Sequence, residues 1–191
     1  MNQALTNFIT VCAPKCGTTA LHRYLGTHPD IFMCEPKEPH FFVHDTIKKW
    51  AHFPAHAHTW EEYTNFFQDG AAQKIRGESS THYLYYDDLP EQLEEALPGA
   101  KTLAIIRHPG QRALSEYNFA FYFGHHSPGS FDTLAKKWVE GKLDHDPRQC
   151  KRFKGSLYAD HIQSYLNTFG KERFRVILHE DLKSQTTGTV R

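Results

Sequence analysis

A lysine, a glycine and two threonines stand together near the start of the chain, in Ala13-Pro14-Lys15-Cys16-Gly17-Thr18-Thr19-Ala20. An apolar, β-branched run ends at Pro14 and helical apolar spacing begins at Leu21, so a strand, a tight loop and a helix are predicted. Such a loop points successive backbone N–H groups at one spot, and the helix start adds its positive dipole end. Gly17 lets the backbone approach closely, and Lys15 supplies a cation. These residues therefore predict a phosphate-binding loop.

A second set of anion-binding residues follows a strongly apolar run. Residues 101–106 are typical of a central parallel strand that is covered on both faces, and Arg107 comes directly after them. Pro109 suits the first turn of a helix, and Ser115 would lie about two turns along it. The Arg107 guanidinium can donate a forked pair of hydrogen bonds and the Ser115 hydroxyl one more, which suits a terminal phosphate.

A third candidate is the carboxylate in Glu35-Pro36-Lys37-Glu38-Pro39-His40-Phe41-Phe42. Its two prolines restrict the backbone, so the polar side chains between them are held at defined angles. Glu38 could accept a proton from a reacting group, or it could be an ordinary surface carboxylate that pairs with Lys37. His40 and His82 are rival bases because histidine titrates near neutrality.

Strands and helices alternate along the chain without internal repeats, which predicts an α/β fold with a mostly parallel sheet. We expect strands near 8–13, 31–33, 74–78, 101–106 and 174–178, and helices near 18–25, 60–67, 83–97, 109–117, 130–141 and 157–170. Residues 144–154 read as a polar, basic loop, Arg112 as a charge on a helix surface, and Tyr117 as a core residue.

Composition narrows the class of protein. The 191 residues suffice for one domain, and the formal net charge of zero disfavours a broad nucleic-acid or anionic membrane surface. No apolar run approaches the length of a membrane span, and residues 1–7 lack the features of a signal peptide. We therefore expect a cytoplasmic protein without a transmembrane segment and without a nucleic-acid partner.

Neither the cysteines nor the histidines form a convincing metal site. The four cysteines do not make a disulfide scaffold in a chain of this length, and buried thiols are the favoured reading over a zinc site. No carboxylate or cysteine accompanies the clustered histidines at ligand spacing. The residues considered were Cys12, Cys16, Cys34, Cys150, His52, His56 and His58.

Three segments carry a resemblance to one family. Residues 14–21, with the lysine before the glycine, resemble the 5′-phosphosulfate loop of sulfotransferases that use 3′-phosphoadenosine 5′-phosphosulfate (PAPS). Residues 37–42 are similar to a segment of the heparan sulfate type of sulfotransferases and their bacterial relatives. An arginine followed eight positions later by a serine, Arg107 and Ser115, resembles the family's 3′-phosphate element, and residues 155–166 also match the family.

The resemblance implies a P-loop-like three-layer fold and transfer of a sulfuryl group from PAPS to a hydroxyl or amine, leaving adenosine 3′,5′-bisphosphate. It implies that Glu38 is the base, that Lys15 stabilises the leaving oxygen, and that Arg107 and Ser115 bind the 3′-phosphate. It assigns the 5′-phosphosulfate to Lys15, Cys16, Gly17, Thr18, Thr19 and Ala20. No metal is expected, because a cation, Arg107, follows the strand where a magnesium-dependent phosphotransferase needs an acidic residue.

Two departures from the family matter. Ser79 stands where relatives often have a lysine, and the chain stops before the family's usual C-terminal helices and basic, glycine-containing loop. We therefore expect residues 1–191 to form a single sulfotransferase domain that lacks its C-terminal part. The alternatives are a P-loop nucleotide or small-molecule kinase and a truncated, non-catalytic nucleotide-binding module. The acceptor stays open among a saccharide, a lipid, a polyketide and a small metabolite.

Overall fold

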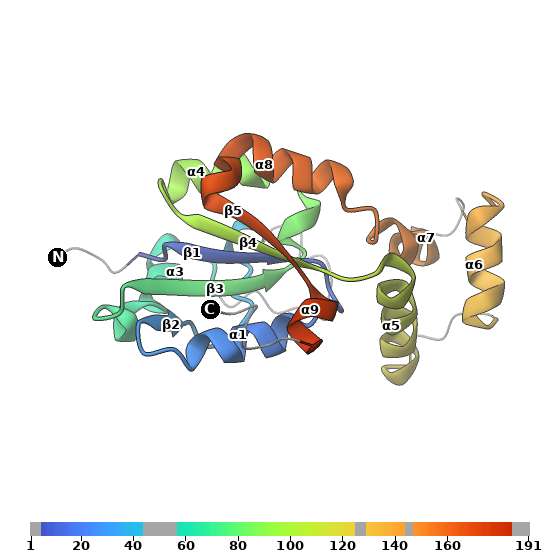
Figure 1. The fold of residues 1–191 in the computed structure, drawn as a ribbon, viewed down its shortest axis with the longest axis horizontal. Coiled ribbons are helices and arrows are strands. Elements are labelled where there is room, and N and C mark those ends of the chain that lie inside the picture. Colours follow the sequence, from blue (N-terminus) through green and yellow to red (C-terminus); the bar gives the residue numbers. More distant parts are fainter. Residues whose placement is uncertain (1–4, 44–56, 125–128, 144–146, 185–191) are drawn as a thin grey trace.

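The computed structural model describes residues 5–43, 57–124, 129–143 and 147–184. Within these ranges five strands form one sheet in the order β2-β3-β1-β4-β5, and every neighbouring pair runs parallel (Figure 1). The strands are β1 (Phe8–Cys12), β2 (Ile31–Met33), β3 (Ile75–Thr81), β4 (Lys101–Ile106) and β5 (Phe174–Leu178).

Helices cover both faces of the sheet, which confirms the predicted three-layer α/β fold. Helices α4 (Leu89–Ala96) and α8 (Ala159–Arg173) lie on one face, and α1 (Thr18–Gly26) lies on the other (Figure 1). The remaining elements are η1 (Phe41–Val43), α3 (Trp60–Asn65), η2 (Gln68–Gly70), η3 (Tyr83–Tyr85), α5 (Pro109–Tyr122), α6 (Phe131–Val139), α7 (Pro147–Lys154) and α9 (His179–Ser184).

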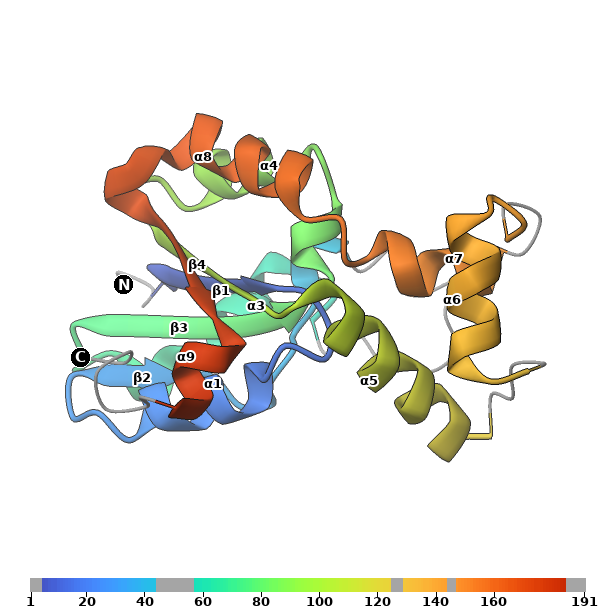
Figure 2. The ribbon, with the colours of Figure 1, turned by 45° about the vertical axis from the view of Figure 1, so that its right-hand side comes forward.

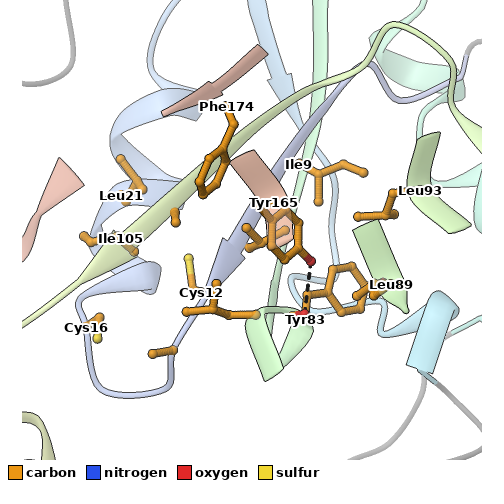
Figure 3. Packing of buried hydrophobic residues seen from close by; sticks show 14 of the residues in the cluster. Ile9, Cys12, Cys16, Leu21, Tyr83, Leu89, Leu93, Ile105, Tyr165 and Phe174 are labelled. Atoms are coloured by element: carbon orange, nitrogen blue, oxygen red, sulfur yellow. Dashed lines mark hydrogen bonds between the residues drawn. The ribbon is translucent and has the colours of Figure 1, made fainter. Parts of the chain in front are cut away.

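The main core lies between the sheet and these helices. Ile9, on the central strand β1, is fully buried, as expected for a parallel strand that is covered on both faces. Leu21 of α1 and Leu93 of α4 pack into the same core (Figure 3). The Tyr165 hydroxyl of α8 donates a hydrogen bond of 3.0 Å to the backbone carbonyl of Tyr83, which ties η3 to this core (Figure 3).

The carboxyl ends of the strands lie together at one edge of the sheet. Cys12, the last residue of β1, is level with Thr81 on β3 and with Ile105 on β4. The loop between β1 and α1, Arg107 and the start of α9 therefore leave the sheet side by side. In parallel α/β sheets this edge is where ligands bind.

Helices α5, α6 and α7 extend beyond that edge as a group (Figure 2). They enclose a small hydrophobic cluster of Ala113, Leu134, Leu143 and Phe153. Half-buried Tyr117 packs against this cluster and not in the main core.

Arg112, expected on a helix surface, is fully buried at the base of α5, so that expectation was wrong. Its guanidinium donates to the Ser156 hydroxyl (2.6 Å), to the Glu116 carboxylate and to the backbone carbonyl of Arg152. These three acceptors compensate the buried charge and hold the start of α5 against the end of α7.

Three further expectations need correction. Residues 147–154 are helical and not a loop, because Cys150 and Phe153 are buried one turn apart and pack the helix against its neighbours. Strand β3 continues through the polar residues up to Thr81, since they pair with β1 along their whole length. A helix was expected to start at residue 83, but only η3 lies there and α4 begins at Leu89.

The four cysteines are free and buried, as predicted. His52 and His56 lie outside the described residues. Among the described residues, no group of three or more metal-ligating side chains is present, and no helix has the length and apolar character needed to cross a bilayer.

Candidate active site

The loop between β1 and α1 has the backbone shape of an anion-binding turn. Lys15 and Gly17 have positive φ angles of 71° and 89°, and Gly17 directly precedes the first residue of α1. A Cβ atom at Gly17 would lie 2.5 Å from Nδ1 of His179, the first residue of α9. Glycine is therefore required by both the backbone angle and the close approach of α9.

The other loop residues differ in exposure. Thr18 is buried, whereas Thr19 and Ala20 are exposed on the first turn of α1. The backbone N–H groups of a first helical turn have no acceptor within the helix, so they are available to a bound anion. Burial raises the pKa of Cys16 to about 11, and its thiol is therefore neutral at physiological pH.

Arg107 joins the loop directly. Its Nη1 donates to the backbone carbonyl of Lys15 at 3.3 Å, and the Tyr158 hydroxyl donates to the Arg107 carbonyl at 3.1 Å. Two buried nitrogens at this edge, Nε of Arg107 and Nδ1 of His179, have no hydrogen-bond partner within the described ranges. A buried donor of this kind favours an oxygen ligand.

Lys15 points its ammonium at an aromatic ring. Its Nζ lies 3.7 Å from the centroid of Phe119 on α5, a cation–π contact. Burial lowers the pKa of Lys15, and nearby Arg107 lowers it further, while Glu116 opposes the shift. Ser115 lies half-buried on the same helix, and its pairing with Arg107 around one phosphate stays a prediction.

Glu38 lies in a backbone segment with unusual geometry. Glu38 and His40 have φ angles of 66° and 53°, in a region that side chains rarely adopt. One oxygen of Glu38 accepts from the Lys37 ammonium, and the other lies 3.2 Å from Nε2 of His40. Burial would raise the pKa of Glu38, but His40 and Lys37 together lower it to about 2.

The rival base His82 lies close by. Its ring centroid is 6.2 Å from that of His40, and its backbone N–H donates to the carbonyl of Cys12 at the end of β1. Ser79, at the position where the resemblance leads one to expect a lysine, lies 3.0 Å from Nδ1 of His22. Burial lowers the pKa of His22, and the positive charge of Lys37 adds to this effect.

Sequence reasoning missed three residues, namely Phe119 and His179 at this edge and Glu78 in the middle of β3. Phe119 and His179 come from parts of the chain far from the loop, and only the fold brings them to it. Glu78 was visible as a polar residue of a strand, and its complete burial was the missing signal.

A family model described as a sulfotransferase domain matches residues 5–191. The chain belongs to the sulfotransferase family. A solved sulfotransferase from Alicyclobacillus acidocaldarius is 31% identical, covering 98% of this chain and 78% of that protein with a TM-score of 0.79. This agreement confirms the predicted family and the P-loop-like sulfotransferase fold.

More distant sulfotransferases match along most of the chain as well. Heparan sulfate glucosamine 3-O-sulfotransferase 5 of Mus musculus is 27% identical over 181 residues, which are 92% of this chain and 48% of that protein. A mouse sulfotransferase complexed with PAP shares the fold, with 17% identity, a TM-score of 0.55 and coverage of 97% and 55%. The chain thus spans about half the length of the heparan sulfate relatives it matches.

Proposed function

We propose that this sulfotransferase-family chain moves a sulfuryl group from PAPS to a hydroxyl or amine of an acceptor, without a metal ion. The observation that carries the proposal is the hydrogen bond from Arg107 to the Lys15 carbonyl, which joins two cationic residues at one edge of the sheet. The shared fold with a sulfotransferase complexed with PAP supports this donor. The cation after β4, in place of an acidic residue, supports charge compensation by side chains and not by magnesium.

When bound, PAPS would supply the sulfuryl group and a phosphate leaving group. The loop fits such an anion, because its positive φ angles and the start of α1 gather N–H groups at one point. The Lys15 ammonium would stabilise negative charge on the leaving oxygen. We assign binding of the 5′-phosphosulfate to Lys15, Cys16, Gly17, Thr18, Thr19 and Ala20.

Arg107 and Ser115 would bind the 3′-phosphate, which distinguishes PAPS from ATP. The buried Nε of Arg107, which lacks a partner among the described residues, is a donor that a phosphate oxygen would satisfy. Ser115 would add one hydroxyl donor from α5. After transfer, adenosine 3′,5′-bisphosphate would be held by the same residues.

Glu38 would take the proton from the acceptor hydroxyl or amine as the acceptor attacks sulfur. Both of its oxygens have partners in the structure, Lys37 on one and His40 on the other. The flexible Lys37 side chain would move away so that the acceptor can donate to the oxygen it leaves. Its ammonium would then supply the cation that Ser79 does not provide.

A titration separates this function from a kinase. We expect adenosine 3′,5′-bisphosphate to raise the midpoint of thermal unfolding at micromolar concentration, and ATP with magnesium to have a smaller effect. Stabilisation by ATP with magnesium alone would overturn the proposal. Transfer of labelled sulfate from PAPS to an acceptor panel then tests catalysis, and binding of the bisphosphate without any transfer would favour a non-catalytic module.

The panel should begin with saccharides, because relatives are described as heparan sulfate and carbohydrate sulfotransferases. Lipid, polyketide and small-metabolite alcohols satisfy the same chemistry and belong in it. We also propose that residues 1–191 belong to a single sulfotransferase domain.

A further inference from the structure

A buried carboxylate lies behind the segment that carries Glu38. Glu78 of β3 is fully buried, and three hydroxyl groups donate hydrogen bonds to it. The donors are Tyr63 of α3 (2.8 Å), Ser80 of β3 (2.6 Å) and Tyr83 of η3 (3.4 Å). Burial raises the pKa of Glu78, and the hydrogen bonds from Ser80 and Tyr63 oppose that shift. The proposed chemistry gives this carboxylate no role.

Two of these hydroxyls also hold the backbone of the Glu38 segment. The N–H of His40 donates to the Ser80 hydroxyl at 3.2 Å, and the N–H of Phe42 donates to the Tyr83 hydroxyl at 3.4 Å. An ionised carboxylate can only accept hydrogen bonds, so it directs the proton of each hydroxyl toward itself. The hydroxyl oxygens are then left to accept the two backbone N–H groups.

The segment needs such restraint. Glu38 and His40 both adopt positive φ angles, which persist in residues with side chains only when the surrounding structure enforces them. Two anchors on the C-terminal side of Glu38 supply that enforcement. The anchors are themselves fixed, because Tyr83 accepts the hydrogen bond from Tyr165 in the main core (Figure 3).

We propose that Glu78 is a positioning residue for the base. It orients the hydroxyls of Ser80 and Tyr83 so that they hold the backbone of residues 40–42, and this fixes the Glu38 carboxylate at the transfer site. The inference rests on the proposed function, in which Glu38 takes the proton of the acceptor. Glu78 touches no reacting group and acts only through the segment it restrains.

Ser80→Ala and Tyr63→Phe form a matched pair that tests this role. Each variant removes one hydroxyl that donates to Glu78, but only the Ser80 hydroxyl also accepts the N–H of His40. In Ser80→Ala, we expect hydrogen exchange of a peptide covering residues 37–43 to rise about tenfold and kcat to fall about 10- to 100-fold. Tyr63→Phe should stay within about threefold of wild type in both measurements.

The affinity for adenosine 3′,5′-bisphosphate should change less than about twofold in both variants, since neither hydroxyl belongs to residues 15–20, which are proposed to bind the nucleotide. Thermal unfolding checks that both variants fold. If Ser80→Ala does not fold, Glu78→Gln gives a second test, because its amide can donate to a hydroxyl and reverse the direction of the hydrogen bond. It should raise exchange over residues 37–43 in the same way.

Equal effects of Ser80→Ala and Tyr63→Phe, or no effect of Ser80→Ala on exchange, would overturn the inference. If the wild type transfers sulfate and Ser80→Ala keeps full turnover, the inference about Glu78 fails. The proposed function then still stands. A wild-type chain without transfer activity would defeat the proposed function. The exchange measurement would then still decide whether Glu78 restrains this segment.

Discussion

The guanidinium of Arg107 donates a hydrogen bond to the backbone carbonyl of Lys15, although the two residues lie 92 positions apart in the sequence. They follow neighbouring parallel strands, β4 and β1, whose carboxyl ends are level. This hydrogen bond places the Arg107 guanidinium against the loop that follows β1. Under the proposed function, one doubly phosphorylated nucleotide would contact both residues at this edge of the sheet.

Arg107→Ala should weaken binding of adenosine 3′,5′-bisphosphate about 10- to 100-fold, the value of a lost charge-assisted hydrogen bond. Adenosine 5′-monophosphate, which lacks the 3′-phosphate, should lose less than about threefold. Isothermal titration calorimetry with both nucleotides measures the difference. Arg107→Lys, which keeps the charge but not the fork, should fall between wild type and Arg107→Ala. Equal losses for the two nucleotides would argue against the 3′-phosphate assignment.

Glu38→Gln should lower kcat about 10²- to 10⁴-fold, because a glutamine side chain cannot accept the proton of the acceptor. Affinity for the bisphosphate should stay near that of wild type, since Glu38 lies outside residues 15–20, which are proposed to bind the nucleotide. Glu35→Gln is the control, as the Glu35 side chain is 80% exposed in the same segment. Turnover that survives Glu38→Gln would move the base to His40 or His82.

Lys37→Met should make turnover more sensitive to acid. With the ammonium present, the pKa of Glu38 is about 2, so the carboxylate is ionised throughout the physiological range. Removing the cation raises this pKa, and activity should then fall at a higher pH than in wild type, although His40 still lowers the pKa. Profiles of kcat/KM between pH 4 and pH 8 for wild type and Lys37→Met measure how far the acid limb moves. An acid limb that does not move would mean that Glu38 carries no proton in the reaction.

Sequence reasoning reached the parts of this site that depend on local pattern. The apolar run before Arg107 predicted a central strand, and the residues around Gly17 predicted the turn that follows β1, because both signals lie within a few positions. The order of strands along the chain then implied that their carboxyl ends meet. Local pattern indicated a phosphate contact for Ser115 and a proton acceptor at Glu38, and the family resemblance made these roles specific as 3′-phosphate binding and general base.

The buried polar residues could not be predicted in this way. Arginine is a charged residue, so Arg112 was expected to be exposed. The hydrogen bond that compensates its burial goes to Ser156, which lies 44 positions away and reaches it only in the folded protein. The polarity of Ser80 likewise suggested a loop, whereas its hydroxyl donates to Glu78, which also accepts from Tyr63 of α3, so that both residues lie in a buried strand. Such long-range compensation leaves no periodic signal in the sequence.

Arg112→Met should reduce the free energy of unfolding by about 1 to 3 kcal/mol, because it removes the ion pair with partly exposed Glu116 and leaves the Ser156 hydroxyl and the Arg152 carbonyl without this donor. Chemical denaturation monitored by circular dichroism measures the loss. Lys136→Met, at an exposed position of α6, should stay within about 0.5 kcal/mol of wild type. A loss at Arg112 as small as that at Lys136 would show that the guanidinium does not hold α5 against α7.

Phe119→Leu should tighten binding of adenosine 3′,5′-bisphosphate about 2- to 10-fold. In the structure the Lys15 ammonium rests 3.7 Å from the Phe119 ring, and this attraction must be given up if the ammonium turns to a bound phosphate. Leucine keeps an apolar side chain at the position and removes the attraction that favours the unbound state. Tyr122→Leu, at a neighbouring aromatic that is 83% exposed, should leave the affinity unchanged. Weaker binding in Phe119→Leu would instead mean that the ring holds Lys15 in place while the nucleotide is bound.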